Sequence, residues 1–110
     1  MNIQLRSARP ADADAMTALF LAARRDAMPY LPELHSDGET RHWMEHQVIA
    51  SGRVTVAERN GEILGFSAVQ GDHLDHLYVA PHLQGHGIGA MLLDKLKEDS
   101  GDNLSLYVFQ

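Results

Sequence analysis

Three alternating glycines, Gly85, Gly87 and Gly89, separate an apolar run that ends at Pro81 from a helical pattern that continues to about Glu98. Glycine permits close approach to the main chain and positive φ angles. The first amides of a helix have no partners within it, and the positive end of the helix dipole lies at the same place. A strand, a glycine loop and a helix in this order therefore predict a phosphate-binding site made of main-chain amides.

Two common phosphate-binding motifs fit this loop poorly. A Walker A loop needs Lys followed by Ser or Thr after its last glycine, and neither is present. Gly85, Gly87 and Ala90 match the pattern G-x-G-x-x-A. A dinucleotide loop, however, should leave its strand almost directly and be followed about 20 residues later by an acidic residue. Because residues 81–84 intervene and the chain ends in Phe109-Gln110, an NAD-binding fragment is the weaker alternative.

The remaining pattern predicts a single mixed α/β domain over residues 1–110. The closing strand–helix–strand unit implies a parallel pair joined by a right-handed crossover, and the middle strands read as an antiparallel meander. Strands are expected at residues 3–6, 54–58, 63–69, 74–80 and 104–109, and helices at 10–28, 36–50 and after Gly89 as far as Leu96 or Glu98.

Local signals support these elements. Asn60-Gly61 is typical of a two-residue hairpin turn, in which both residues have positive φ. Ser36 and Glu39 have the spacing of a capping box, and Gly65 inside a strand indicates a bulge. One helical stripe is expected to face the core: Met16, Leu19, Phe20 and Ala23.

Composition excludes several classes of function. The 110 residues carry 9 Lys and Arg against 15 Asp and Glu, a net charge of −6, so no nucleic-acid partner is expected. No apolar run approaches the ~18 residues of a membrane span, and the N-terminus does not resemble a signal peptide, so no membrane partner is expected. The absence of Cys removes thiolate metal sites and cysteine nucleophiles and suits a cytoplasmic location.

Residues 77–93 resemble the acyl-CoA-binding motif of the GNAT superfamily of N-acetyltransferases, with Pro81 after the strand and Gln84, Gly87 and Gly89 at the fixed positions. The order of elements matches that family over essentially the whole chain. The resemblance implies a GNAT-like fold whose parallel pair splays at the cofactor site. The cofactor-binding positions that it implies are Leu77, Tyr78 and Val79 on the strand and Gln84, Gly85, His86, Gly87, Ile88, Gly89 and Ala90 in the loop.

The activity implied is acetyl transfer from acetyl-CoA to a primary amine by direct attack on the thioester. A base must take the proton of the amine, and Asp75 and His76 are the candidates. Adjacent strand residues face opposite ways, so only one of the two is expected to point into the site, and the sequence leaves the choice open. The first two helices line the acceptor side in that family, which makes Tyr30 and Trp43, with His35, candidates for substrate contacts.

Family members continue beyond the last strand with a helix, often bearing a Tyr that protonates the leaving thiolate, and two more strands. The resemblance therefore implies a C-terminally incomplete domain, whose apolar terminal strand a second copy could cover in a homodimer. No general acid is assigned, because Tyr107 is more typical of an ordinary strand aromatic. The alternative to an active enzyme is a non-catalytic acyl-CoA-binding module or an inactive truncated acetyltransferase.

His42, Glu45 and His46 spell H-x-x-E-H, the inverted zinc-protease motif. Two His residues four apart on a helix can bind zinc, but a third protein ligand is needed, and the sequence pattern does not indicate one. The motif therefore indicates a helix surface with scattered His and Glu, and no metal is expected.

Overall fold

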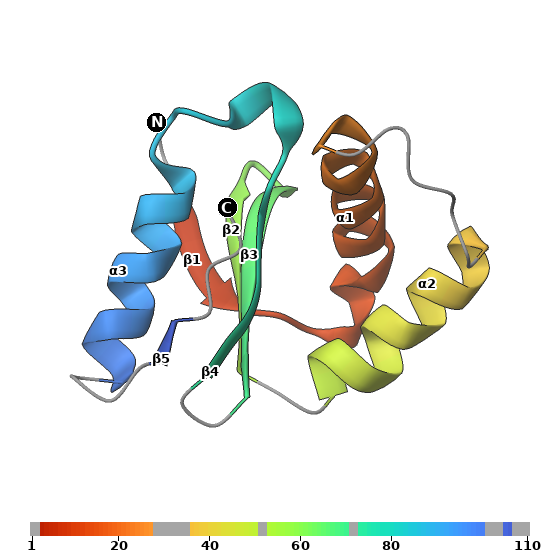
Figure 1. The fold of residues 1–110 in the computed structure, drawn as a ribbon, viewed down its shortest axis with the longest axis horizontal. Helices are drawn as coiled ribbons and strands as arrows, with labels where there is room; N and C mark the ends of the chain where they lie inside the picture. Colours follow the sequence, from red (N-terminus) through yellow and green to blue (C-terminus); the bar gives the residue numbers. More distant parts are fainter. Residues whose placement is uncertain (1–2, 28–35, 51–52, 71–72, 101–104, 107–110) are drawn as a thin grey trace.

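The computed structural model describes residues 3–27, 36–50, 53–70, 73–100 and 105–106, which form a mixed α/β sheet with helices on both faces (Figure 1). The strands are β1 (Gln4–Ser7), β2 (Arg53–Arg59), β3 (Glu62–Gln70), β4 (His73–Val79) and β5 (Ser105–Leu106), in that order across the sheet. Neighbours from β1 to β4 are antiparallel, and β4 and β5 are parallel. The predicted meander and parallel pair are confirmed, although most of the predicted strand 104–109 lies outside the described residues.

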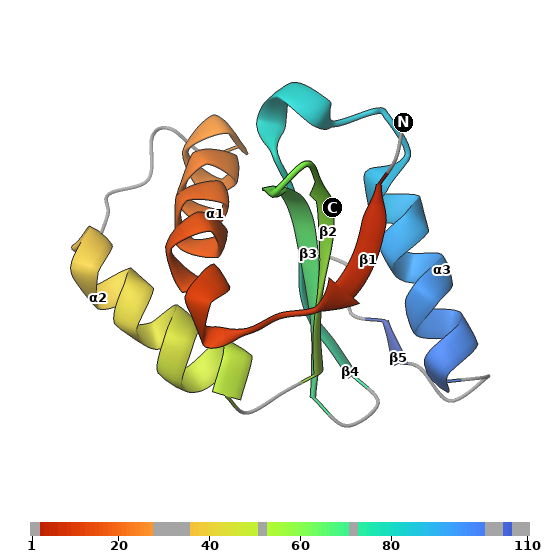
Figure 2. The same cartoon turned by 180° about the vertical axis from the view of Figure 1, so that it is seen from behind.

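Two helical layers enclose the sheet. Figure 2 shows α1 (Ala13–Ala27) and α2 (Asp37–Trp43) on one face and α3 (Ile88–Ser100) on the other. Two short 3₁₀ turns, η1 (Pro10–Asp12) and η3 (Pro81–Leu83), precede α1 and the glycine loop. The α2 helix continues directly into a π-helical segment, η2 (Met44–Ile49). The predicted helix over 36–50 is therefore present as one rod (the α2–η2 rod), with an α-helical first part and a π-helical second part. None of the helices in the described ranges has the length and apolar character needed to cross a bilayer.

The expected local signals are confirmed. Ser36 Oγ accepts the Glu39 N–H at 3.1 Å, and the Glu39 carboxylate accepts the Ser36 N–H at 3.1 Å, which completes the capping box. Asn60 and Gly61 have φ of 53° and 82° in the β2–β3 turn. The α1 stripe is buried, with exposed fractions of 0% to 6%.

Gly65 explains how α3 reaches the sheet. The β2–β3 register shifts between Ala57 and Glu58, which places the predicted bulge beside Gly65. A Cβ at Gly65 would lie 2.9 Å from the Tyr78 carbonyl oxygen and 3.2 Å from Ile88 Cγ2. The missing side chain therefore lets the first turn of α3 rest directly on β3 and β4.

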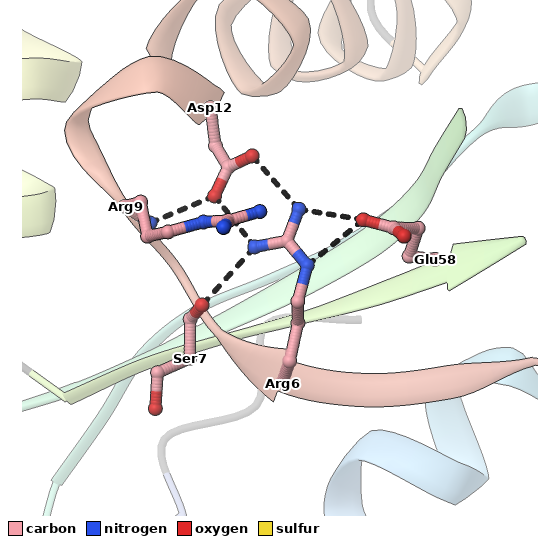
Figure 3. Close-up of polar contacts among 5 residues, drawn as sticks. All are labelled: Arg6, Ser7, Arg9, Asp12 and Glu58. Carbon is pink, nitrogen blue, oxygen red and sulfur yellow. Dashed lines mark hydrogen bonds and ion pairs between the residues drawn. The ribbon is translucent and has the colours of Figure 1, made fainter. Parts of the chain in front are cut away.

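Arg6 on β1 ties the start of the α1 segment to β2 (Figure 3). Its guanidinium donates to both carboxylate oxygens of Asp12, at 2.8 and 2.9 Å, and its Nε donates to Glu58 at 2.8 Å. The Arg9 N–H also donates to Asp12, at 2.7 Å. The hydrogen bonds from Arg6, above all, hold the pKa of Asp12 below its ordinary value. This network fixes the point where the chain leaves the sheet for the helical layer.

Arg6→Ala is expected to lower the free energy of unfolding by about 2 kcal/mol, because it leaves a nearly buried carboxylate without its bidentate partner. The pKa of Asp12 is depressed in the folded protein, so its contribution is complete above the unfolded pKa and is lost as pH falls through the folded pKa. Urea unfolding from neutral pH to about pH 3 should show a smaller acid-induced loss in the variant than in the wild type.

The matched control is Arg41→Ala. Arg41 is also ion-paired, but its side chain is 43% exposed against 25% for Arg6. Exposed ion pairs contribute little, so this variant should unfold close to the wild type. Equal losses of stability in the two variants would contradict the role given to Arg6.

Candidate functional site

Two of the three alternating glycines have the positive φ that glycine permits, and the third, Gly89, lies in the first turn of α3. The glycine loop follows β4 through η3 and enters α3, with Gly85 and Gly87 at φ of 87° and 83°. A Cβ at either glycine would meet nothing within 4 Å, so glycine is needed there for the φ angle rather than for space inside the protein. The space outside these two residues is open to a ligand.

Five main-chain amides in this loop and the first turn of α3 have no main-chain acceptor among the described residues. Gln84 N–H donates to the Pro81 carbonyl at 3.4 Å and His86 N–H to the Leu83 carbonyl at 3.3 Å. The next amide to find a backbone partner is that of Met91, at 3.0 Å from the Gly87 carbonyl oxygen. No main-chain acceptor occurs within the described residues for the amides of Gly85, Gly87, Ile88, Gly89 and Ala90.

The main chain of β4 presents alternate residues to the edge away from β3. Ala80 N–H donates to the Leu64 carbonyl at 2.9 Å, and Val79 lies opposite Gly65. Hydrogen-bonded and non-hydrogen-bonded pairs alternate along an antiparallel ladder, so Tyr78 directs its main chain to β3. Leu77 and Val79 direct theirs to the other edge. Of the three predicted strand positions, two can therefore bond a ligand through the main chain.

A bulge in β4 corrects the expectation that Asp75 and His76 face opposite ways. Ala68 pairs with His76 and Val69 with Leu74, so Asp75 is an extra residue on β4. Leu74 and Leu77 both pack into the small apolar cluster beneath α3. The two residues between them therefore share the opposite face, because the extra residue interrupts the alternation.

Asp75 and His76 line one small cavity of about 130 Å³, together with Trp43, Gln47 and Val48 from the α2–η2 rod. The His76 ring lies 5.5 Å from the Trp43 ring, edge to face, and 6.0 Å from the Tyr78 ring. Burial lowers the pKa of His76, and the nearby Asp75 charge opposes that effect only partly. His76 is therefore a half-buried imidazole whose lowered pKa favours the neutral form, which is the form that can accept a proton.

A larger cavity of about 840 Å³ lies between α1 and α2. Phe20 and Trp43 line it, with ring centroids 5.4 Å apart, and Phe20 also meets Tyr78 edge to face at 4.9 Å. Trp43 lines both cavities and so connects this space with His76. Burial raises the pKa of Tyr78, against an opposing effect of Arg24.

The structure thus brings together Asp75, His76 and Trp43, three of the predicted catalytic and acceptor residues. Tyr30, His35 and Tyr107 lie outside the described residues. Sequence reasoning missed Gln47, Tyr78 as a side chain in the aromatic cluster, and Arg24. The position of Phe20 on the predicted core stripe places its neighbour Arg24, four residues later, on an adjoining part of the same helix face.

His42 and His46 have rings 4.3 Å apart, and His46 Nε2 lies 3.0 Å from the Glu45 carboxylate. Within the part of the chain that the structure describes, no three His, Asp or Glu side chains gather closely enough to hold a metal ion. The H-x-x-E-H motif therefore has no third ligand among the described residues.

Known acetyltransferases are similar to this chain in sequence and in fold. The family model for the acetyltransferase (GNAT) domain matches residues 50–109. A probable N-acetyltransferase of Mycobacterium tuberculosis, Rv2775, is 30% identical over 111 residues, which cover 86% of this chain and 63% of that protein. The chain thus spans less than two thirds of the length of this relative.

Solved structures share the fold. The integron cassette protein VCH_CASS6 from the mobile metagenome of V. cholerae matches with a TM-score of 0.77 and 18% identity, over all of this chain and 77% of that one. A GNAT family acetyltransferase from Brucella melitensis, solved in complex with acetyl-CoA, matches with a TM-score of 0.67 and 24% identity, over 99% of this chain and 77% of that one. With the family model matching more than half of its residues, the chain belongs to the GNAT acetyltransferase family.

Proposed function

We propose that this chain binds acetyl-CoA and promotes transfer of its acetyl group to a primary amine. The observation that carries the proposal is the set of glycine-loop amides without a main-chain acceptor among the described residues, together with the outward peptide groups of Leu77 and Val79. The acetyl-CoA complex of the Brucella relative supports the same ligand class. The lack of Cys accords with a cytoplasmic site of action.

On the donor side, main-chain groups do the binding. The amides of Gly85 and of residues 87–90 hold the pyrophosphate at the positive end of α3. The peptide groups of Leu77 and Val79 pair with the pantetheine arm as with an added strand, and one of their N–H groups polarises the thioester carbonyl. Acetyl-CoA supplies the activated acyl group as co-substrate.

On the acceptor side, His76 is the proposed base. A new C–N bond forms to the amine, the C–S bond breaks, and the sulfur leaves as the thiolate of CoA. His76 accepts the proton that the amine loses, directly or through water in the small cavity that it lines with Asp75. Asp75 is the alternative base, since the bulge gives it access to the same cavity.

The test is thermal unfolding with excess acetyl-CoA and, separately, with NAD. Acetyl-CoA at ~100 times its Kd should add ~2.7 kcal/mol and raise Tm by several degrees, whereas NAD should leave Tm unchanged. Release of CoA thiol in the presence of a panel of amines then measures turnover. No shift with acetyl-CoA from a cooperatively unfolding sample would reject the proposal. A shift without turnover of any amine would identify a non-catalytic acyl-CoA-binding module instead.

A further inference from the structure

The larger cavity combines aromatic walls with one cation. Phe20 and Trp43 supply the rings, and Arg24, one turn after Phe20 on α1, supplies a guanidinium. Arg24 is exposed, and it is near enough to Tyr78 for its charge to oppose the rise that burial causes in the pKa of the phenol. The cation therefore lies beside the same aromatic cluster that reaches His76.

Within the described residues, Arg24 differs from Arg25 and Arg41 because it has no carboxylate partner. Arg25 pairs with Asp37 at 3.1 Å, and Arg41 pairs with Asp14 and Glu45. For Arg24, by contrast, no ion pair or hydrogen bond is found within the described ranges. No carboxylate of the described part of the chain therefore neutralises its charge.

The other charged and polar groups of the cavity are engaged. Glu39 accepts the Ser36 N–H at 3.1 Å as part of the capping box. His42 packs against the His46 ring at 4.3 Å. Among the described residues that line the cavity, Arg24 is therefore the side chain that offers a positive charge to a ligand, whereas the Glu39 carboxylate is already engaged at the start of α2.

We infer that the acceptor is a primary amine that also carries a carboxylate and an apolar side group, as in an amino acid. Arg24 pairs with the carboxylate, whose two oxygens match one guanidinium. Phe20 and Trp43 contact the apolar group, and the amine extends along Trp43 toward His76, because Trp43 lines both cavities. This inference rests on the proposed acetyl transfer, whose product would be an N-acetyl amino acid.

The single Trp of the chain is Trp43, so its fluorescence reports ligand entry without any need for turnover. The probes are N-acetyl-phenylalanine and N-acetyl-phenylalaninamide, which differ only in carboxylate against neutral amide. The carboxylate probe is expected to bind the wild type about tenfold more tightly than the amide probe. This factor is at the low end for a charge-assisted hydrogen bond, because Arg24 is exposed. Added salt should reduce this preference.

Arg24→Ala should bring the two dissociation constants within about twofold of each other, and Arg24→Lys should keep part of the preference because it keeps the charge. The control is Arg25→Ala, the same change at the next position of α1, where the arginine is paired with Asp37. This control should keep the full preference. Equal binding of the probes to the wild type, binding of neither probe, or an unchanged preference in Arg24→Ala would each overturn the inference.

Failure of the proposed function gives a different result. If acetyl-CoA neither stabilises the protein nor yields thiol, the acetyl transfer is rejected even where the carboxylate probe binds through Arg24. If acetyl-CoA binds and simple amines are acetylated but Arg24 does not distinguish the probes, the acceptor class alone is rejected.

Discussion

Replacing Ala90 with Glu is expected to weaken acetyl-CoA binding about 100-fold. Ala90 is exposed in the first turn of α3, and its amide is one of the five proposed to hold the pyrophosphate. A carboxylate about 5 Å from the phosphate charge opposes binding by about 3 kcal/mol at an effective dielectric constant of about 20. Each 1.4 kcal/mol corresponds to about tenfold in Kd. The free protein should keep or raise its Tm, because Glu in a first turn is favourable toward the helix dipole.

Calorimetric titration with acetyl-CoA measures this effect, and Ala90→Gln is the matched control. Gln has nearly the shape of Glu without its charge, so it separates repulsion from steric obstruction. A Gln variant that loses as much affinity as the Glu variant would mean that space rather than charge decides. A Glu variant with wild-type affinity would show that the pyrophosphate does not bind at this loop.

His76→Gln is expected to lower kcat by about 100-fold or more, the range for loss of a positioned general base. The base must be unprotonated, so kcat/KM of the wild type should rise with pH through the pKa of His76. Burial places that pKa below the ordinary value for His, so the acid limb should lie at correspondingly low pH. The variant should lack this limb, whereas the titration of the amine itself is common to both proteins. Initial rates over a pH series, with acetyl-CoA saturating, provide the measurement.

Asp75→Asn is the comparison that decides between the two candidates. Both side chains line the same small cavity, so both variants disturb it similarly. We expect Asp75→Asn to retain the acid limb with a smaller loss of kcat. The assignment of the base would pass to Asp75 if its variant lost the limb while His76→Gln kept it.

Much of the fold follows from local patterns. The α1 stripe, the capping box of Ser36 and the Asn60-Gly61 turn each act within a few residues, and all three occur where the sequence predicts them. The π-helical winding of Met44–Ile49 is different, because no short-range pattern marks it. The network of Arg6 with Asp12 and Glu58 also joins residues up to 52 positions apart, which a local pattern does not contain.

The candidate site shows the same division. The glycine loop was predictable because positive φ at Gly85 and Gly87 is a local property. The orientation of Asp75 was not, because the extra residue in β4 exists only relative to its partner strand. The engagement of Gln84 and His86 amides within the loop likewise depends on η3, whose main-chain bonds a residue pattern does not specify.

The outward peptide groups of Leu77 and Val79 belong to the main chain, so the proposed donor half of the site depends little on which side chains stand there. Their side chains pack on the α3 side, where Leu77 joins the small apolar cluster and Val79 approaches Gly89. Any residue that packs there and keeps the strand extended preserves the same donor surface. The proposed acceptor half, by contrast, consists of side chains such as Arg24 and Trp43. Acceptor preference can therefore diverge by single substitutions in the helical layer while the donor half is carried along unchanged.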